Sequence, residues 1–184
     1  KIHLQTLEKN IFSDKEKLHI AENVEMVENT LTQVRNLSLD LRPSMLDDFG
    51  LTTALKWYLD RQRKKININF ETHNLQKKLP GELEITCYRI VQEAVTNIIR
   101  HSAAKNIYID LWIEDEKLNL KVYDDGKGFN VKSARKKAIS GESMGILGMQ
   151  ERVELIGGGF EIFSSPGKGT EIRAVFPIKD KIEK

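Results

Sequence analysis

Residues 1–45 carry a repeating pattern of apolar positions that predicts paired helices. From residue 13 to residue 41 the apolar positions alternate steps of four and three, which is a repeat of 3.5 residues. Ser13 and Glu16 match the capping box that opens a helix, and Pro43 follows the end of the repeat. The positions of the repeat are Ile20, Val24, Val27, Leu31, Val34, Ser38 and Leu41.

An apolar stripe of this kind needs a packing partner. Residues 1–10 have the pattern of a preceding helix, so we expect an antiparallel helical hairpin that pairs with a second copy in a four-helix bundle. The alternative is an ordinary helix docked on its own domain. The predicted helix is far longer than the ~11–12 residues typical of globular proteins, and this favours a dimerisation stalk.

From residue 46 onward the pattern breaks into shorter segments of helical or alternating period. Helices are predicted at residues 51–65, 81–100 and 145–156, and strands at residues 66–70, 107–112, 118–123, 160–163 and 170–176. The short turn at residues 114–117 predicts an antiparallel hairpin. We therefore predict two domains, residues 1–45 and 46–184, the second an α+β fold with a mixed, mainly antiparallel sheet covered by helices on one face.

Composition narrows the class of protein. The chain has 184 residues, 40% of them hydrophobic and 30% charged, which suits a folded domain. Its formal net charge is only +2, and its basic and acidic residues are interspersed along the chain. We therefore expect no nucleic-acid partner. The single Cys87 predicts a reducing, intracellular setting. No apolar run approaches the ~20 residues of a membrane helix, and the start at Lys1 in mid-pattern predicts that any membrane span lies upstream.

The predicted helix at residues 81–100 carries polar residues among its apolar ones. Glu93, Asn97, Arg100 and His101 follow at intervals that place them on one helical face. A carboxylate one turn before a carboxamide supplies oxygen ligands for a hydrated Mg²⁺ that bridges phosphates, and Arg100 is placed to meet phosphate charge. The alternative is a solvated stripe on an amphipathic helix.

Glycine-containing segments follow the later strands. Asp124 ends an apolar strand, and Gly126 and Gly128 allow the backbone to approach a flat ligand closely, with the Asp124 carboxylate accepting a hydrogen bond from an exocyclic amine. The alternative is a tight turn. Gly145 and Gly148 open a helix whose free amides suit phosphate.

The segment from Ser165 to Thr170 alone predicts only a hairpin turn, and the chain contains neither a P-loop nor a Rossmann glycine fingerprint.

The order of these four segments is more specific than any one of them. Residues 82–177 resemble the ATP-binding domain shared by histidine kinases, Hsp90, gyrase-type topoisomerases and MutL, which is a two-layer α/β sandwich of the Bergerat type. The resemblance implies that Asn97 holds Mg²⁺, Glu93 is the candidate general base with a possible water-mediated metal contact, and Asp124 binds adenine. Residues 129–143 would form an ATP lid. The other implied nucleotide-binding residues are Arg100, His101, Gly126, Gly128, Gly145, Gly148 and Thr170.

The segment from Arg35 to Leu51 narrows the resemblance to one subfamily of the histidine kinases. Arg35, Leu37 and Ser38, followed by Leu41-Arg42-Pro43 and by Gly50-Leu51, are similar to the sensor histidine kinases of the nitrate-sensor and DesK type. This similarity implies an ATP-dependent protein histidine kinase that acts as a homodimer through the helical hairpin. It also implies a LuxR/NarL-type response regulator as partner and a location on the cytoplasmic side of a membrane-associated sensor.

The subfamily's phosphoacceptor histidine precedes an acidic residue, and none of His3, His19, His73 or His101 does so. We therefore expect the acceptor to lie on an upstream helix outside this chain. The rival functions are an ATP-driven conformational machine, an anti-sigma serine kinase of the same superfamily, and a regulatory dimerisation module that catalyses nothing. Asn97 and Asp124 argue against the last of these, because a module without nucleotide has no need of them.

Overall fold

The computed structural model describes Asn23, Val27 and residues 44–75, 79–134 and 145–178. The chain divides into two compact units, Lys1–Ser44 and Met45–Lys184. Asn23 and Val27 are helical, and the rest of the predicted hairpin and its dimer contacts lie outside the described residues, so both stay predictions. None of the helices within the described ranges is long and apolar enough to cross a bilayer.

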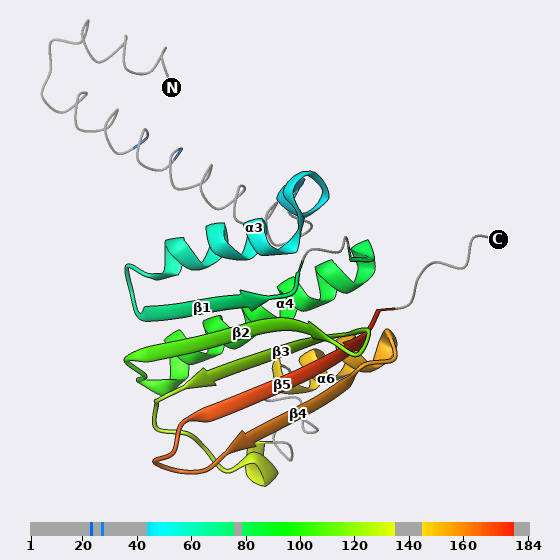
Figure 1. Ribbon diagram of the computed structural model, residues 1–184. Helices are drawn as coiled ribbons and strands as arrows, with labels where there is room; N and C mark the ends of the chain where they lie inside the picture. The colour runs from blue at the N-terminus through cyan, green and yellow to red at the C-terminus, as the bar shows by residue number, and fades with distance from the viewer. Residues whose placement is uncertain (1–22, 24–26, 28–43, 76–78, 135–144, 179–184) are drawn as a thin grey trace, which may run out of the picture. The chain divides into compact units, whose positions relative to one another are not determined.

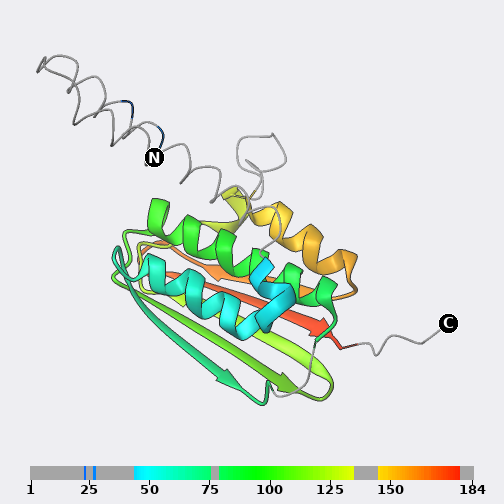
Figure 2. The same cartoon turned by 90° about the horizontal axis from the view of Figure 1, so that it is seen from above.

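The second unit is built on one five-stranded sheet of order β1-β2-β3-β5-β4 (Figure 1). β1 pairs with β2 in parallel, and the other three pairings are antiparallel. Figure 2 shows α3, α4 and α6 together on one face of this sheet, which confirms the predicted α+β class. The elements are α3 (Ser44–Gln62), β1 (Asn67–His73), α4 (Gly81–Asn97), the π-helical turn η1 (Ile98–Ser102), β2 (Asn106–Glu114), β3 (Lys117–Asp124), α6 (Gly145–Leu155), β4 (Gly159–Ser164) and β5 (Thr170–Pro177).

The core lies between the sheet and its helices because alternate strand residues point to one face. In β3 the inward positions are Leu118, Leu120, Val122 and then Asp124, all at most 1% exposed. The same alternation in β2 and β5 buries apolar residues beside them. The strand period therefore carries one carboxylate, that of Asp124, to the end of an otherwise apolar row.

The helices differ from the prediction at two ends. The predicted helix from residue 51 follows a kink at Gly50 (φ 76°) in α3, where Glu84 accepts a hydrogen bond from the Leu51 amide at 3.4 Å. The predicted helix at residues 81–100 is α-helical only to Asn97 and continues as the wider η1. Ser102 closes that turn by donating its hydroxyl proton to the Ile98 carbonyl at 2.8 Å.

The C-terminus of α6 has the bonds of a Schellman motif. The Gly158 amide donates to the Val153 carbonyl at 2.9 Å and the Gly157 amide to the Glu154 carbonyl at 2.9 Å. Gly157 has a φ of 75°, a conformation that costs glycine little. The glycines after residue 156 thus end the helix and start β4, as the sequence predicts.

The predicted β2–β3 hairpin has a two-residue turn in which Asp115 (φ 48°) and Glu116 (φ 56°) are both left-handed. A left-handed backbone costs an L-residue roughly 1–2 kcal/mol, and glycine avoids this cost. We expect Glu116→Gly to raise the free energy of unfolding by about 1 kcal/mol, measured by urea denaturation. Asn119→Gly, within β3, should lower the free energy of unfolding by a similar amount. Destabilisation by both variants would contradict this account of the turn.

Candidate functional site

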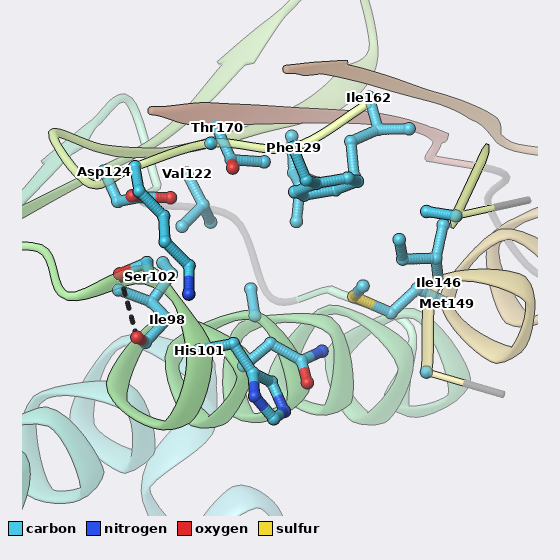
Figure 3. A pocket seen from close by; sticks show the side chains of 17 residues that line it. Ile98, His101, Ser102, Val122, Asp124, Phe129, Ile146, Met149, Ile162 and Thr170 are labelled. Atoms are coloured by element: carbon cyan, nitrogen blue, oxygen red, sulfur yellow. Dashed lines mark hydrogen bonds between the residues drawn. The ribbon is translucent and has the colours of Figure 1, made fainter. Parts of the chain in front are cut away.

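A cavity of about 450 Å³ lies between α4 with η1, the sheet, and the start of α6. Its volume falls in the range of small-molecule sites, roughly 300–1,000 Å³. Figure 3 shows Asp124 and Thr170 toward one end and Ile146 with Met149 toward the other, with Phe129 and Ile162 along one wall. The lining residues are Ala94, Asn97, Ile98, His101, Ser102, Val122, Asp124, Lys127, Gly128, Phe129, Ala134, Gly145, Ile146, Met149, Ile162, Thr170 and Ile172.

Asp124 is the buried acidic group of this cavity. Its Oδ1 atom accepts a hydrogen bond from the Gly126 amide at 2.8 Å. Its Oδ2 atom is buried and has no hydrogen-bond partner among the residues that the structure describes. Burial raises the pKa of Asp124 above the usual range of aspartate, and the polar groups of Gly126 and Thr170 offset only part of this effect. The site thus holds an unused acceptor that is suited to a ligand's N–H group.

Glycines surround this carboxylate where a side chain would collide. A Cβ on Gly126 would lie 2.5 Å from Asp124 Oδ1 and 2.6 Å from the Ser102 carbonyl oxygen. Gly169 has a φ of 69° and packs against the Asp124 carbonyl group. The Lys127 amide donates to the Ser102 carbonyl at 2.8 Å, which joins the loop after β3 to η1. Close backbone packing therefore fixes the position of the acid.

A second polar group lies where α4 meets α6. The Asn97 carboxamide donates through Nδ2 to Glu93 Oε1 at 3.0 Å, as their four-residue spacing predicts. A Cβ on Gly145 would collide with Glu93 Oε1 and lie 3.2 Å from Asn97 Nδ2. The first residue of α6 therefore packs directly on this pair, and a side chain there would require the Glu93 carboxylate to move.

The structure brings most of the predicted site residues together. Those that line the cavity are Asn97, His101, Asp124, Gly128, Gly145 and Thr170. The other predicted residues do not line it. Glu93 lies behind Asn97, and Gly126 lies beneath the Asp124 carboxylate. Arg100 is exposed on η1, and a Cβ on Gly148 would contact the Arg152 guanidinium instead of the cavity.

Several lining residues were missed by sequence reasoning. Lys127 contributes a positive charge to the cavity lining. It lies between Gly126 and Gly128, which are both predicted nucleotide-binding residues. The apolar lining residues, such as Val122 and Ile172, are inward positions of strands, and their alternation alone marks them as core. Phe129 begins the polar stretch that was predicted to be a lid. Residues 131–134 of that stretch form a helical turn, and residues 135–144 lie outside the described part of the chain.

Comparisons with known proteins identify the family of this chain. Residues 82–180 match the family model of the histidine kinase-, DNA gyrase B- and HSP90-like ATPases. The chain therefore belongs to this family. The predicted superfamily resemblance is confirmed.

Curated relatives narrow the similarity to sensor kinases. An uncharacterized sensor-like histidine kinase of Chloroflexus aurantiacus is 37% identical over 84% of this chain and 27% of its own length. The oxygen sensor histidine kinase NreB of Staphylococcus carnosus is 32% identical over 90% and 48%. The sensor histidine kinase LiaS of Bacillus subtilis is 37% identical over 85% and 43%. These relatives confirm the resemblance to the nitrate-sensor and DesK type, although the chain spans less than half of their lengths.

A solved structure supports the fold alone. The histidine kinase domain of the blue-light activated kinase EL346 from Erythrobacter litoralis superposes with a TM-score of 0.60 at 16% identity. The match covers 95% of this chain and 90% of that one. This likeness agrees with the predicted Bergerat-type architecture.

The buried charge of Asp124 predicts how stability depends on pH. The pKa of Asp124 is higher in the folded protein than in the unfolded chain, so the carboxyl group stabilises the fold at pH values below its pKa in the unfolded chain. This contribution to stability is lost as the pH rises through the pKa in the folded protein. At neutral pH, Asp124→Asn should raise the unfolding free energy of the nucleotide-free protein by about 1 kcal/mol. The same variant should lose ADP binding in calorimetry.

Asp125→Asn is the matched control, because Asp125 is exposed and plays a different part. Its carboxylate accepts hydrogen bonds from the backbone amides of Asn106 at 2.9 Å and Lys105 at 2.8 Å, and from Asn106 Nδ2 at 2.6 Å. These bonds, chiefly from Asn106, hold the pKa of Asp125 below its usual range, so its contribution is lost as pH falls. Asp125→Asn should therefore destabilise the protein. A shift of both variants in the same direction would contradict the burial argument.

Proposed function

We propose that this chain is the catalytic fragment of a two-component sensor histidine kinase. It binds Mg-ATP and transfers the γ-phosphate to a histidine on a first dimerisation helix outside this chain, for relay to an aspartate of a response regulator. The observation that carries the proposal is the buried Asp124 Oδ2 atom, which has no hydrogen-bond partner among the described residues. It lies at one end of the cavity, in a chain that belongs to the ATPase family. The relatives support the kinase class, since each of them is named a histidine kinase or a histidine-kinase-like protein.

The proposed pose places the adenine against the apolar lining, with its exocyclic amine donating to Asp124 Oδ2. Thr170 lies directly opposite Asp124 in the β3–β5 register and lines the same end of the cavity. Gly128, with a φ of 58°, lets the loop after β3 pack closely against the Ser165 carbonyl, where a Cβ would collide. The phosphates then extend toward Asn97 and Gly145, and Arg100 and His101 lie on η1 beside them.

The proposed magnesium contact follows from the orientation of Asn97. Because its Nδ2 group donates to Glu93, its amide oxygen is the atom left to bind a cation. Mg²⁺ commonly takes only one or two protein ligands besides phosphates and waters. This fits the site, where no cluster of three or more His, Cys, Asp or Glu side chains is found among the described residues. When bound, the ion neutralises phosphate charge.

Two roles are proposed for Glu93. It is the candidate general base, or its carboxylate orients the Asn97 carboxamide. The carboxylate contacts the carboxamide of Asn97 and the backbone of Gly145, so it stands beside the proposed phosphate end of the cavity. In-line phosphoryl transfer depends mainly on positioning and charge neutralisation. Orientation of the Asn97 carboxamide is therefore the main role that we propose for Glu93.

The remaining proposals concern the whole kinase. We infer a homodimer through the helical hairpin, a LuxR/NarL-type response regulator as partner, and a location on the cytoplasmic side of a membrane sensor. His73 and His101 are the histidines within the described ranges, and they are followed by Asn74 and Ser102 instead of an acidic residue. This supports an acceptor histidine outside the chain.

Asn97→Ala should weaken the magnesium-dependent part of nucleotide affinity by about tenfold, because the amide oxygen is lost. Calorimetry with ATP in magnesium and then in EDTA separates the two parts. Asn69→Ala, an exposed change on β1, is the matched control and should leave both affinities unchanged. An equal loss for Asn97→Ala in EDTA would remove the proposed metal role.

The kinase proposal is tested by transfer between chains. The fragment is mixed with γ-labelled ATP and a longer protein that contains the first dimerisation helix but carries Asp124→Asn in its own site. We expect acid-labile label on the longer protein, as phosphohistidine is acid-labile. Labelling should disappear when the fragment also carries Asp124→Asn. Acid-stable label would favour a serine kinase instead.

A further inference from the structure

The last residue of β4, Ser164, makes three polar contacts through one hydroxyl. Its Oγ atom accepts a hydrogen bond from the Phe129 amide at 2.9 Å and donates to the Gly169 carbonyl at 2.7 Å. It also lies 3.1 Å from the hydroxyl oxygen of Thr170. The side chain therefore joins the loop after β3 to the turn between β4 and β5.

Two of these partners belong to the nucleotide cavity, although Ser164 does not line it. Phe129 and Thr170 are both lining residues, and Figure 3 shows them near each other on the sheet side of the cavity. Phe129 is 35 residues away from Ser164 in the sequence. One hydroxyl thus ties two parts of the cavity wall that the chain itself does not hold together.

Backbone contacts keep these two segments close but do not fix Phe129. The Gly167 amide donates to the Lys127 carbonyl at 2.6 Å. Gly128 packs against the Ser165 carbonyl, where a Cβ would collide. Both contacts precede Phe129 in the loop. The Phe129 ring packs partly buried against the core, and the bond from its amide to Ser164 holds the backbone that carries the ring.

We propose that Ser164 is a positioning residue for nucleotide binding. It holds the Phe129 backbone so that the ring stays in the cavity wall, and it holds Thr170 at its place opposite Asp124. A site that is held in its binding conformation binds more tightly, because less ordering is needed on binding. The inference rests on the proposed function only for the identity of the ligand.

Four variants test the role of the hydroxyl. Ser164→Ala and Ser164→Cys remove it, and the thiol of the second fills the space but is only a weak donor and acceptor. Ser164→Thr keeps the hydroxyl and is compatible with a strand. Ser165→Ala changes the exposed neighbour and serves as the matched control. ADP affinity is measured by calorimetry, and exchange of the Phe129 amide hydrogen by NMR in the nucleotide-free protein.

We expect Ser164→Ala and Ser164→Cys to weaken ADP binding by about tenfold and to speed exchange at Phe129. Ser164→Thr should restore both values to near wild type, and Ser165→Ala should change neither. Unchanged affinity in Ser164→Ala, or equal loss in Ser164→Thr, would overturn the proposal.

The exchange measurement separates this proposal from the proposed function. If the wild-type protein failed to bind ADP while Phe129 exchange still depended on the hydroxyl, the proposed function would fail and the tie between the two segments would stand. If ADP bound normally and exchange at Phe129 were the same in all variants, the positioning role would be rejected and nucleotide binding would remain.

Discussion

The constraint on which the site depends is a carboxylate buried with one oxygen unpaired. A buried acceptor without a partner costs the fold free energy, and protein structures rarely keep one without a reason. In this chain the strand period of β3 delivers Asp124 to the core, and Gly126 supplies only one of the hydrogen bonds that it can accept. In the proposed complex an N–H donor of the nucleotide removes this cost, so the unpaired oxygen destabilises the nucleotide-free state and not the bound state.

The surrounding structure serves to keep that carboxylate in place. On one side, Asn67 donates to Asn106, which in turn donates to Asp125, the neighbour of Asp124, at 2.8 and 2.6 Å. On the other side, the Ser102 carbonyl in η1 accepts a hydrogen bond from the Lys127 amide. The site is thus supported both from the start of the parallel pair β1–β2 and from the end of the helix that carries Asn97.

Much of the fold follows from the sequence because its cause is local. The alternation Leu118, Leu120, Val122 predicts β3 and its buried face, and the short turn after β2 predicts the hairpin. The Glu93–Asn97 bond likewise follows from helical spacing. These features depend on the period of a single element, so one sequence suffices to predict them.

The features that the sequence did not predict depend on distant partners. An apolar pair such as Ile98 and Ile99 suits an α-helix and a π-helix equally, and the π-helical turn ends at Ser102, which accepts a hydrogen bond from the remote Lys127 amide. Arg100 is exposed on η1, and its contact with phosphate stays a prediction. Ser164 lies between the strand predicted at residues 160–163 and the turn predicted from residue 165, and its bond to Phe129 was not predicted because Phe129 is remote in the sequence. The most direct measurement of the central claim is the affinity of the wild-type domain for ADP and for inosine diphosphate, which lacks the exocyclic amine. An unpaired Asp124 acceptor predicts that inosine diphosphate binds at least about a hundredfold more weakly, and equal affinities would contradict the account.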